Sequence, residues 1–185
     1  MIICAGNGEV FPYARPIGVG LVESTITLTE LVIKDRPNFL FFIGTAGSYG
    51  KKEIFDIIAS KSACNIENSY FGSHAYTPID NFITTSEDVS RETIVNSSNY
   101  ITTDFSIGEN YIKRNIHIEN MEFFSVMSVA RRFGLPAGGL FVVTNYCNKD
   151  AHCDFIQNQS KALKLLDSYI HENRDKLFRN LTNGK

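Results

Sequence analysis

The sequence lacks an excess of charge of either sign, and it lacks a long apolar run. Its 185 residues include 18 basic and 20 acidic side chains, so the formal net charge is only −2. A protein that binds nucleic acid by neutralising phosphates is usually more basic. No stretch approaches the roughly 18 apolar residues that a membrane-spanning helix requires. The composition therefore argues against nucleic acid and against a membrane as the partner.

Cysteine is scarce and scattered, with four residues in the chain. The chain begins without the basic segment and apolar stretch of an export signal. These features predict a cytoplasmic protein with reduced thiols. Cys147, His152 and Cys153 lie close together in sequence, but their spacing matches none of the usual zinc patterns. No metal site is expected.

Repeats and low-complexity segments are also absent, whereas aromatic residues are plentiful, with 14 Phe and 8 Tyr. The hydrophobic content of 43% and the charged content of 21% are typical of a soluble globular protein. We therefore expect a single folded domain over residues 1–185.

Short apolar runs bounded by glycine predict the strands. Residues 39–43 and 140–143 are continuous apolar runs, which is typical of strands buried on both faces of a sheet. Residues 54–59 form a third candidate strand, and residues 100–103 form a weaker fourth. Residues 61–99 are polar and mixed, and their pattern indicates no definite element apart from a short helix and site loops.

Apolar residues at helical spacing predict helices over 155–178, capped by Asp154, and over 121–133, between Asn120 and Gly134. Residues 21–34 contain threonines and an isoleucine that favour a strand locally. Their length and the preceding Gly-Val-Gly turn favour a helix, which is the prediction adopted. Strands that alternate with helices predict an α/β fold with a largely covered sheet.

Ligands of such sheets bind at the carboxyl ends of the strands, which selects the turns after Ile43, Thr103 and Val143. The small residues of 44–48 allow close approach to the backbone. A carboxylate at the start of helix 121–133 could accept hydrogen bonds from sugar hydroxyls, and the polar segment 144–150 could meet the edge of a base. Each of these three features also has an ordinary structural explanation. Residues 44–48 could be a plain glycine-rich turn, the carboxylate could be there because the helix dipole favours it, and segment 144–150 could be a strand-to-helix loop.

The order and spacing of these segments resemble the purine and uridine phosphorylase superfamily, which includes the nucleosidases that cleave methylthioadenosine and adenosylhomocysteine. Residues 18–20 are similar to the family's Gly-x-Gly turn, and residues 39–47 to its strand followed by Gly-Ser/Thr-Ala-Gly. Residues 101–105 resemble its base-stacking loop, residues 120–122 its Glu-Met-Glu motif, and residues 140–148 its strand ending in Ser-Asp. The resemblance covers nearly the whole chain. It implies a mixed, largely buried central sheet flanked by helices.

The resemblance also implies cleavage of an N-glycosidic bond, with positive charge developing on the ribose and negative charge on the departing base. Thr45 would hold the nucleophile, and Ala46 and Gly47 would line the site. Met121 and Glu122 would hold the ribose.

At the base, the resemblance assigns two positions. Phe105 or Ser106 would neighbour the base, and Asn148 would face its edge. No cofactor is implied, although inorganic phosphate is a conceivable co-substrate.

Four departures from the family pattern bear on the chemistry. Residues 1–7 align best with the family's second strand, so the first strand and the loop after it, which carries the water-activating Glu in nucleosidases, are expected to be missing. Phe42 stands where many phosphorylases have an arginine, which disfavours phosphate and favours water. Asn148 replaces the acid Asp, and such an Asn occurs in phosphorylases of 6-oxopurines. Asn120 replaces the first Glu of Glu-Met-Glu.

A displaced carboxylate from Asp104, Asp150 or Glu9 could compensate for the last substitution. The leading hypothesis is a purine nucleosidase. The alternatives are a nucleoside-binding member without catalysis and a 6-oxopurine nucleoside phosphorylase. The resemblance further implies a homo-oligomer, with a twofold dimer as the favoured form.

Overall fold

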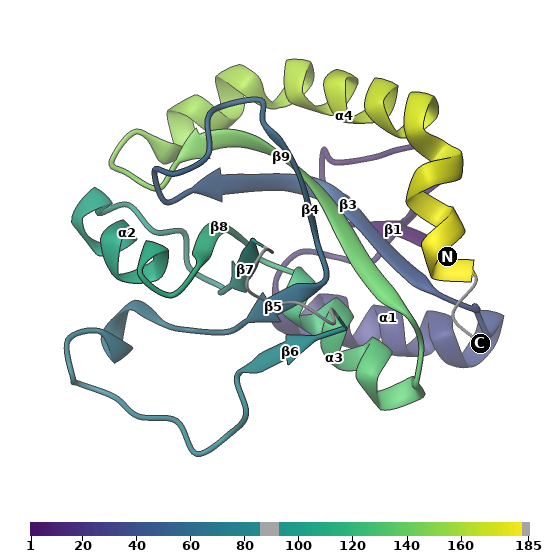
Figure 1. The fold of residues 1–185 in the computed structure, drawn as a ribbon, viewed down its shortest axis with the longest axis horizontal. Helices are drawn as coiled ribbons and strands as arrows, with labels where there is room; N and C mark the ends of the chain where they lie inside the picture. The colour runs from purple at the N-terminus through teal and green to yellow at the C-terminus, as the bar shows by residue number, and fades with distance from the viewer. Residues whose placement is uncertain (86–92, 183–185) are drawn as a thin grey trace.

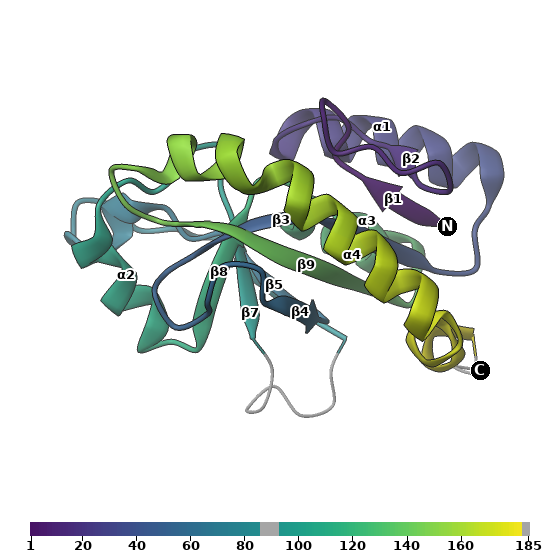
Figure 2. The ribbon, with the colours of Figure 1, turned by 90° about the horizontal axis from the view of Figure 1, so that it is seen from above.

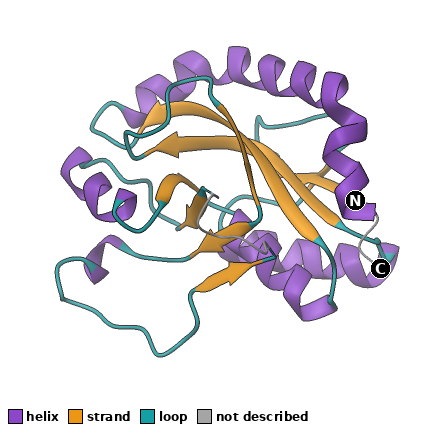
Figure 3. Cartoon of the chain, in the orientation of Figure 1, coloured by secondary structure: helices purple, strands orange, loops and turns teal. Residues whose placement is uncertain are grey.

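A computed structural model describes residues 1–85 and 93–182, and within them the chain forms one domain. Four α-helices and one short 3₁₀ turn flank a mixed nine-stranded sheet (Figures 1 and 3). The helices are α1 (Leu21–Asp35), α2 (Phe105–Ile112), α3 (Phe123–Phe133) and α4 (Ala151–Thr182), and the 3₁₀ turn is η1 (Asn68–Tyr70). The strands are β1 (Ile2–Cys4), β2 (Arg15–Pro16), β3 (Leu40–Ser48), β4 (Ile57–Ser60), β5 (Ser62–Cys64), β6 (Phe82–Thr84), β7 (Ile94–Ser97), β8 (Ile116–Asn120) and β9 (Ala137–Tyr146).

Strand β3 is the centre of the sheet. It pairs in parallel with β1 near its start and with β9 along its whole length, and its end pairs antiparallel with β8. Strand β8 continues the sheet through β7 and β5 to β6, while β4 pairs antiparallel with β9. The carboxyl ends of the parallel strands β3 and β9 therefore meet the end of β8 at one place.

The helices cover both faces of this sheet. Helices α1 and α3 pack against each other on one face, and α4 runs along β9 on the other (Figures 1 and 2). The apolar residues of β3 alternate between these faces, with Phe42 in the cluster under α1 and α3 and Ile43 in the cluster under α4. This two-sided burial explains why residues 39–43 are continuously apolar.

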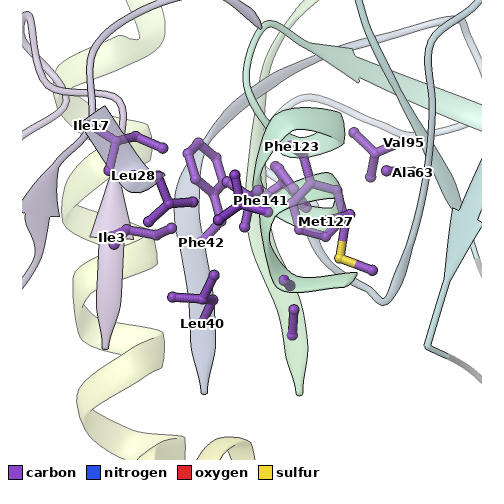
Figure 4. Packing of buried hydrophobic residues seen from close by; sticks show 14 of the residues in the cluster. Ile3, Ile17, Leu28, Leu40, Phe42, Ala63, Val95, Phe123, Met127 and Phe141 are labelled. Carbon is purple, nitrogen blue, oxygen red and sulfur yellow. The ribbon is translucent and has the colours of Figure 1, made fainter. Parts of the chain in front are cut away.

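An aromatic group fills the centre of the α1–α3 face (Figure 4). The ring of Phe141 lies with its centroid 5.0 Å from that of Phe123 and 5.7 Å from that of Phe42. Gly139 leaves room for this group, because a Cβ there would come within 2.8 Å of the rings of Phe123 and Phe141. Phe42 thus belongs to the core, and its side chain does not face the end of β3.

Phe141→Ala is expected to lower the free energy of unfolding by about 3–5 kcal/mol, because it removes a fully buried ring from a close-packed group. Urea unfolding followed by circular dichroism measures the loss. Phe141→Leu, which keeps most of the volume, should cost less. A loss below about 1 kcal/mol for the alanine variant would show that this group is not the packed centre of the core.

The predicted helices are present, and α1 confirms the helical interpretation of residues 21–34. The strands predicted at 39–43 and 140–143 lie inside β3 and β9, and the strand predicted at 54–59 overlaps β4. The strand predicted at 100–103 is wrong, because these residues form a loop. The backbone N–H of Thr102 donates to the carboxylate of Glu119 at 2.8 Å instead of to a neighbouring strand. The neighbouring strand β7 pairs in parallel with β5 and β8.

Candidate active site

A cavity of about 300 Å³ opens where β3, β8 and β9 end, a size that accommodates one small ligand. Its walls come from the loop after β1, the turns before α1 and α3, the ends of β3, β8 and β9, the loop before α2, and the first turns of α4. The residues that line it are Ala5, Gly6, Asn7, Glu9, Val19, Thr45, Ala46, Gly47, Tyr100, Ile101, Glu119, Asn120, Met121, Glu122, Asn145, Ala151, His152 and Phe155.

Glu9 and Thr45 form a hydrogen-bonded pair in this cavity. The Thr45 hydroxyl donates to Oε1 of Glu9, and the Thr45 backbone N–H donates to Oε2 at 3.0 Å. Gly44 makes room for the carboxylate, since a Cβ there would lie 2.8 Å from Oε2 of Glu9. Burial raises the pKa of Glu9, and the two hydrogen bonds from Thr45 partly oppose that rise. Strand β1 thus lies beside β3, and the loop after β1 carries the Glu9 carboxylate to the cavity.

Glu122 is the second carboxylate of the cavity, and backbone and amide donors hold it in place. Its Oε1 accepts from the N–H of Gly20 at 3.1 Å. Its Oε2 accepts from the amide of Asn120 at 3.1 Å and from the N–H of Met121 at 3.2 Å. Burial raises the pKa of Glu122 to about 7, and the charge of Glu9 adds to the rise.

Asn120, which replaces the first Glu of the family's Glu-Met-Glu motif, helps to hold Glu122 in place. The side chain of Asn120 donates to Glu122, while its Oδ1 accepts from the Ser97 hydroxyl at 2.9 Å and from the N–H of Phe123 at 3.2 Å. A carboxylate at position 120 would place a second negative charge against Glu122 and could not donate to it. The amide therefore braces the carboxylate at the start of α3.

Asn145 reaches the cavity because of a bulge between β3 and β9. The pairing runs from Ala46 opposite Val143 directly to Gly47 opposite Asn145, so Thr144 is the extra residue. The absence of a side chain at Gly47 matters here, since a Cβ would lie 3.0 Å from Nδ2 of Asn145. The amide of Asn145 donates to the carbonyl of Tyr146 at 3.2 Å and retains capacity for a ligand.

The structure brings together five of the site residues predicted from sequence. All five line the cavity, and they come from the end of β3 and the turn before α3: Thr45, Ala46, Gly47, Met121 and Glu122.

Three predicted site residues lie elsewhere. Asn148 is in the turn before α4, where its Oδ1 accepts from the N–H of Asp150 at 2.8 Å. The Ser106 hydroxyl donates to Asp104 at 2.7 Å, which caps α2. Phe105 is 54% exposed and does not line the cavity. These positions differ from the predicted ones because β9 extends to Tyr146 and the loop before α2 enters the cavity earlier, at residues 100–101.

Sequence reasoning missed several residues of the wall. Glu9 was considered only as a displaced carboxylate, and Asn145 and Ile101 only as members of the segments 144–150 and 101–105. Glu119 and Tyr100 were given no role in a site. The polar residues directly after a long apolar strand could have indicated that Asn145 lies near the site. The bulge that directs its side chain into the cavity cannot be predicted from the sequence pattern. Nothing in the local sequence distinguishes Glu119 from any carboxylate next to a helix.

Other kinds of site find no support in the described parts of the chain. Within residues 1–85 and 93–182, no three side chains of the metal-ligating types gather into one group. Cys147 is buried, whereas Cys153 is exposed. None of the helices described here is both long and apolar enough to cross a bilayer.

Comparison with known proteins places this chain in a family. A family model described as the phosphorylase superfamily matches residues 2–172, so the chain belongs to that superfamily. This confirms both the resemblance and the fold expected from the sequence. No match was found among curated proteins.

Solved structures share the fold at low sequence identity. A mutant 5′-methylthioadenosine/S-adenosylhomocysteine nucleosidase from Helicobacter pylori, with 5′-methylthioadenosine in its active site, is 18% identical with a TM-score of 0.78, covering 95% of this chain and 97% of that one. The native futalosine hydrolase of H. pylori strain 26695 is 19% identical with a TM-score of 0.78, covering 95% and 96%. The nucleosidase from S. pneumoniae is 12% identical with a TM-score of 0.72, covering 90% and 94%.

Proposed function

We propose that this protein hydrolyses the N-glycosidic bond of a purine nucleoside. The observation that carries the proposal is the presence of two braced carboxylates in one cavity, Glu9 on Thr45 and Glu122 on the backbone before α3. The similar structures named above are nucleosidases and a hydrolase, and two of them are named for purine nucleosides. These names support the choice of reaction and of a purine.

Glu122 binds the ribose in this proposal. Its carboxylate has about four acceptor positions, and three protein donors leave capacity for a sugar hydroxyl. Met121 lies beside it in the wall and offers an apolar surface to the sugar ring. As the glycosidic bond lengthens, the ribose gains positive charge, which an ionised carboxylate stabilises.

Glu9 activates water as a general base. Both carboxylate oxygens are oriented by Thr45, so a water molecule that donates to Glu9 is directed into the cavity. Glu9 takes one proton of the water as the oxygen attacks the anomeric carbon, and the bond to the base breaks. The departing base keeps the electron pair of the broken bond and takes a proton from solvent, and Glu9 releases its proton to solvent. Asn145 donates a hydrogen bond to the growing negative charge of the base.

Charge in the cavity favours water over phosphate. Among the described residues, those that line it include three glutamates and no lysine or arginine. A phosphate dianion would meet negative charge without a cation to balance it. Phosphorolysis is therefore the less favoured alternative, and a binder without catalysis is disfavoured by the braced Glu9.

The test is release of free base. Purified protein is incubated with adenosine, inosine, guanosine, methylthioadenosine and adenosylhomocysteine, each with and without phosphate, and the products are separated by chromatography. We expect base to appear without phosphate. Release that requires phosphate would replace hydrolysis by phosphorolysis, and no release from any substrate would contradict catalysis on these nucleosides.

The same proposal includes a twofold dimer. Helix α1 exposes an apolar row at i, i+4 and i+11, made of Val22, Ile26 and Ile33, with exposed fractions of 66%, 57% and 61%. Val22 and Ile26 also line a shallow apolar groove between α1 and α3. A second copy of this chain, packed through the same row, would remove this apolar surface from water.

Ile26→Asp is expected to convert the dimer to a monomer, because it places a charge in the centre of the apolar row. Light scattering coupled to size-exclusion chromatography gives the mass. Lys164→Asp, which changes charge on α4 at the opposite face of the sheet, should leave the mass unchanged. A wild-type protein that elutes as a monomer at micromolar concentration would contradict the dimer.

A further inference from the structure

Glu9 lies in a long loop, residues 5–14, which joins β1 to β2. These strands are three and two residues long, so the sheet itself holds only the two ends of the loop. At its tip, Gly6 and Glu9 exchange two backbone hydrogen bonds, and Asn7 and Gly8 between them have φ angles of 49° and 98°. Positive φ at both central residues is characteristic of a type I′ turn. This turn sets the direction in which the chain enters Glu9.

Helix α4 supports this loop from outside the sheet. Near the tip, a Cβ at Gly8 would lie 3.3 Å from Nε2 of Gln159, so the backbone of the turn lies against the helix. Two residues after Glu9, the ring of Phe11 is 4% exposed and belongs to the apolar cluster that includes Leu166 of α4. The loop therefore depends on α4 as well as on the sheet for its position.

Tyr13 joins the far end of the loop to α4. Its hydroxyl donates to Oδ1 of Asp167 at 2.7 Å, across 154 positions of the chain. The ring of His171 packs edge-on against that of Tyr13, with centroids 5.6 Å apart and planes at 78°, and its Nε2 lies 3.6 Å from the same carboxylate oxygen. Burial and the hydrogen bond to Asp167 raise the pKa of Tyr13, so the phenol keeps its proton and remains a donor.

Glu9 is thus held from two sides. On the cavity side, the hydroxyl and the N–H of Thr45 orient its carboxylate. On the side of α4, the contact of Tyr13 with Asp167 holds the backbone that carries Glu9, four residues away. A general base must lie within about 2.6–3.2 Å of the atom whose proton it takes. A displacement of about 1 Å caused far from the reacting atoms can lower a rate by about 100-fold.

Resting on the proposed function, we infer that Tyr13 is a positioning residue for the general base: its hydrogen bond to Asp167 holds the loop on α4 where Glu9 can take a proton from water. Tyr13 is not among the residues that line the cavity, so it acts through Glu9. Its loss slows the step that needs Glu9. Nucleoside binding, which depends on Glu122 in the proposed reaction, stays the same.

The first test removes only the hydroxyl. Tyr13→Phe keeps the ring and its packing against His171. With the nucleoside that the wild-type protein cleaves fastest, we expect kcat for base release to fall by about 10- to 100-fold and KM to be nearly unchanged. Tyr76→Phe, at a tyrosine that is 89% exposed, is the matched control and should keep the wild-type kcat. An unchanged kcat in Tyr13→Phe would overturn the inference.

The second test changes the acceptor. Asp167→Asn keeps a carbonyl oxygen that accepts from Tyr13, so most of the wild-type kcat should remain. Asp167→Leu removes the acceptor and should lose as much kcat as Tyr13→Phe, and it takes the place of that variant if Tyr13→Phe does not fold. Equal activity of the asparagine and leucine variants would contradict a role for this hydrogen bond.

A double variant separates positioning from a general loss of stability. Glu9→Gln already removes the group that Tyr13 is inferred to place. Adding Tyr13→Phe to it should therefore lower kcat no further, because two residues that act through one group are not additive. If Tyr13 only stabilises the fold, the two losses multiply and the double variant is slower than Glu9→Gln by the full Tyr13→Phe factor. That outcome would overturn the inference.

If the wild-type protein releases no base, the proposed function fails, and amide hydrogen exchange measured by NMR decides the inference alone. The N–H of Thr45 donates to Glu9, so its exchange rate reports whether the carboxylate stays in place. Faster exchange at Thr45 in Tyr13→Phe, with unchanged rates in α3, supports the inference, since it shows a local opening of the loop. Unchanged exchange at Thr45 overturns it.

Discussion

Glu122→Ala is expected to weaken nucleoside binding by about 10- to 100-fold while the fold is kept. One hydrogen bond from a ribose hydroxyl to a charged carboxylate is worth about 1.5–3 kcal/mol, which corresponds to that range. Isothermal titration with the preferred nucleoside measures the loss, and circular dichroism checks the fold. Unchanged affinity in the alanine variant would show that the ribose lies elsewhere.

The isosteric Glu122→Gln variant adds a pH signature. Because burial raises the pKa of Glu122 to about 7, nucleoside affinity in the wild type should increase as the pH rises through 7. The raised pKa also means that the folded state holds this proton more tightly than the unfolded state. Stability from this group is therefore lost as the pH rises from about 4.5, its unfolded value, through 7. Both trends should be reduced in the glutamine variant.

Glu9→Gln is expected to lower kcat by about 10²- to 10⁴-fold, the usual contribution of a general base. Nucleoside affinity should change only a few-fold, because in the proposed reaction it is Glu122 that holds the ribose. Single-turnover base release measures the chemical step. The glutamine can keep both contacts, because its carbonyl oxygen accepts from the Thr45 N–H and its amide donates to the Thr45 hydroxyl. The loss therefore reports the proton-accepting group rather than the local structure.

The matched control is Glu109→Gln, an exposed carboxyl on α2, which should retain full activity. The pH profile gives an independent readout. Since burial raises the pKa of Glu9, wild-type kcat should climb with pH as Glu9 loses its proton. A glutamine variant that keeps most of its kcat would mean that another group activates the nucleophile.

Much of the fold could be predicted from the sequence, because buried strands and helices have recognisable patterns of apolar residues. A strand covered on both faces must be apolar throughout, so residues 39–43 and 140–143 identified the two central strands. A helix that packs on one side repeats its apolar residues every three to four positions, which identified α4. Helix α3 was identified from apolar residues around its whole axis, between Asn120 and Gly134. The motif at 120–122 predicted a site carboxylate beside a helix start, and the structure puts Glu122 in the cavity wall.

The loops could not be predicted as well, because their conformation depends on contacts with residues far away in the sequence. Residues 100–103 contain β-formers, yet Thr102 binds Glu119, a residue 17 positions away, and the segment becomes part of the cavity wall. Asn148 was the expected base-edge residue because residues 140–148 resemble the family's strand that ends in Ser-Asp. The strand continues to Tyr146 through a bulge, and that bulge aims Asn145 instead.

The sequence by itself determined the class of fold, the superfamily and the end of the sheet where the site lies, since these follow from apolar periodicity and from short motifs in order. Only the tertiary structure decided which polar groups share the cavity. Glu9, Glu119 and Asn145 come from three separate strands or loops, and their meeting depends on sheet register, a bulge and the missing side chains of Gly44 and Gly47. Such contacts join residues far apart in the chain, so no local pattern encodes them.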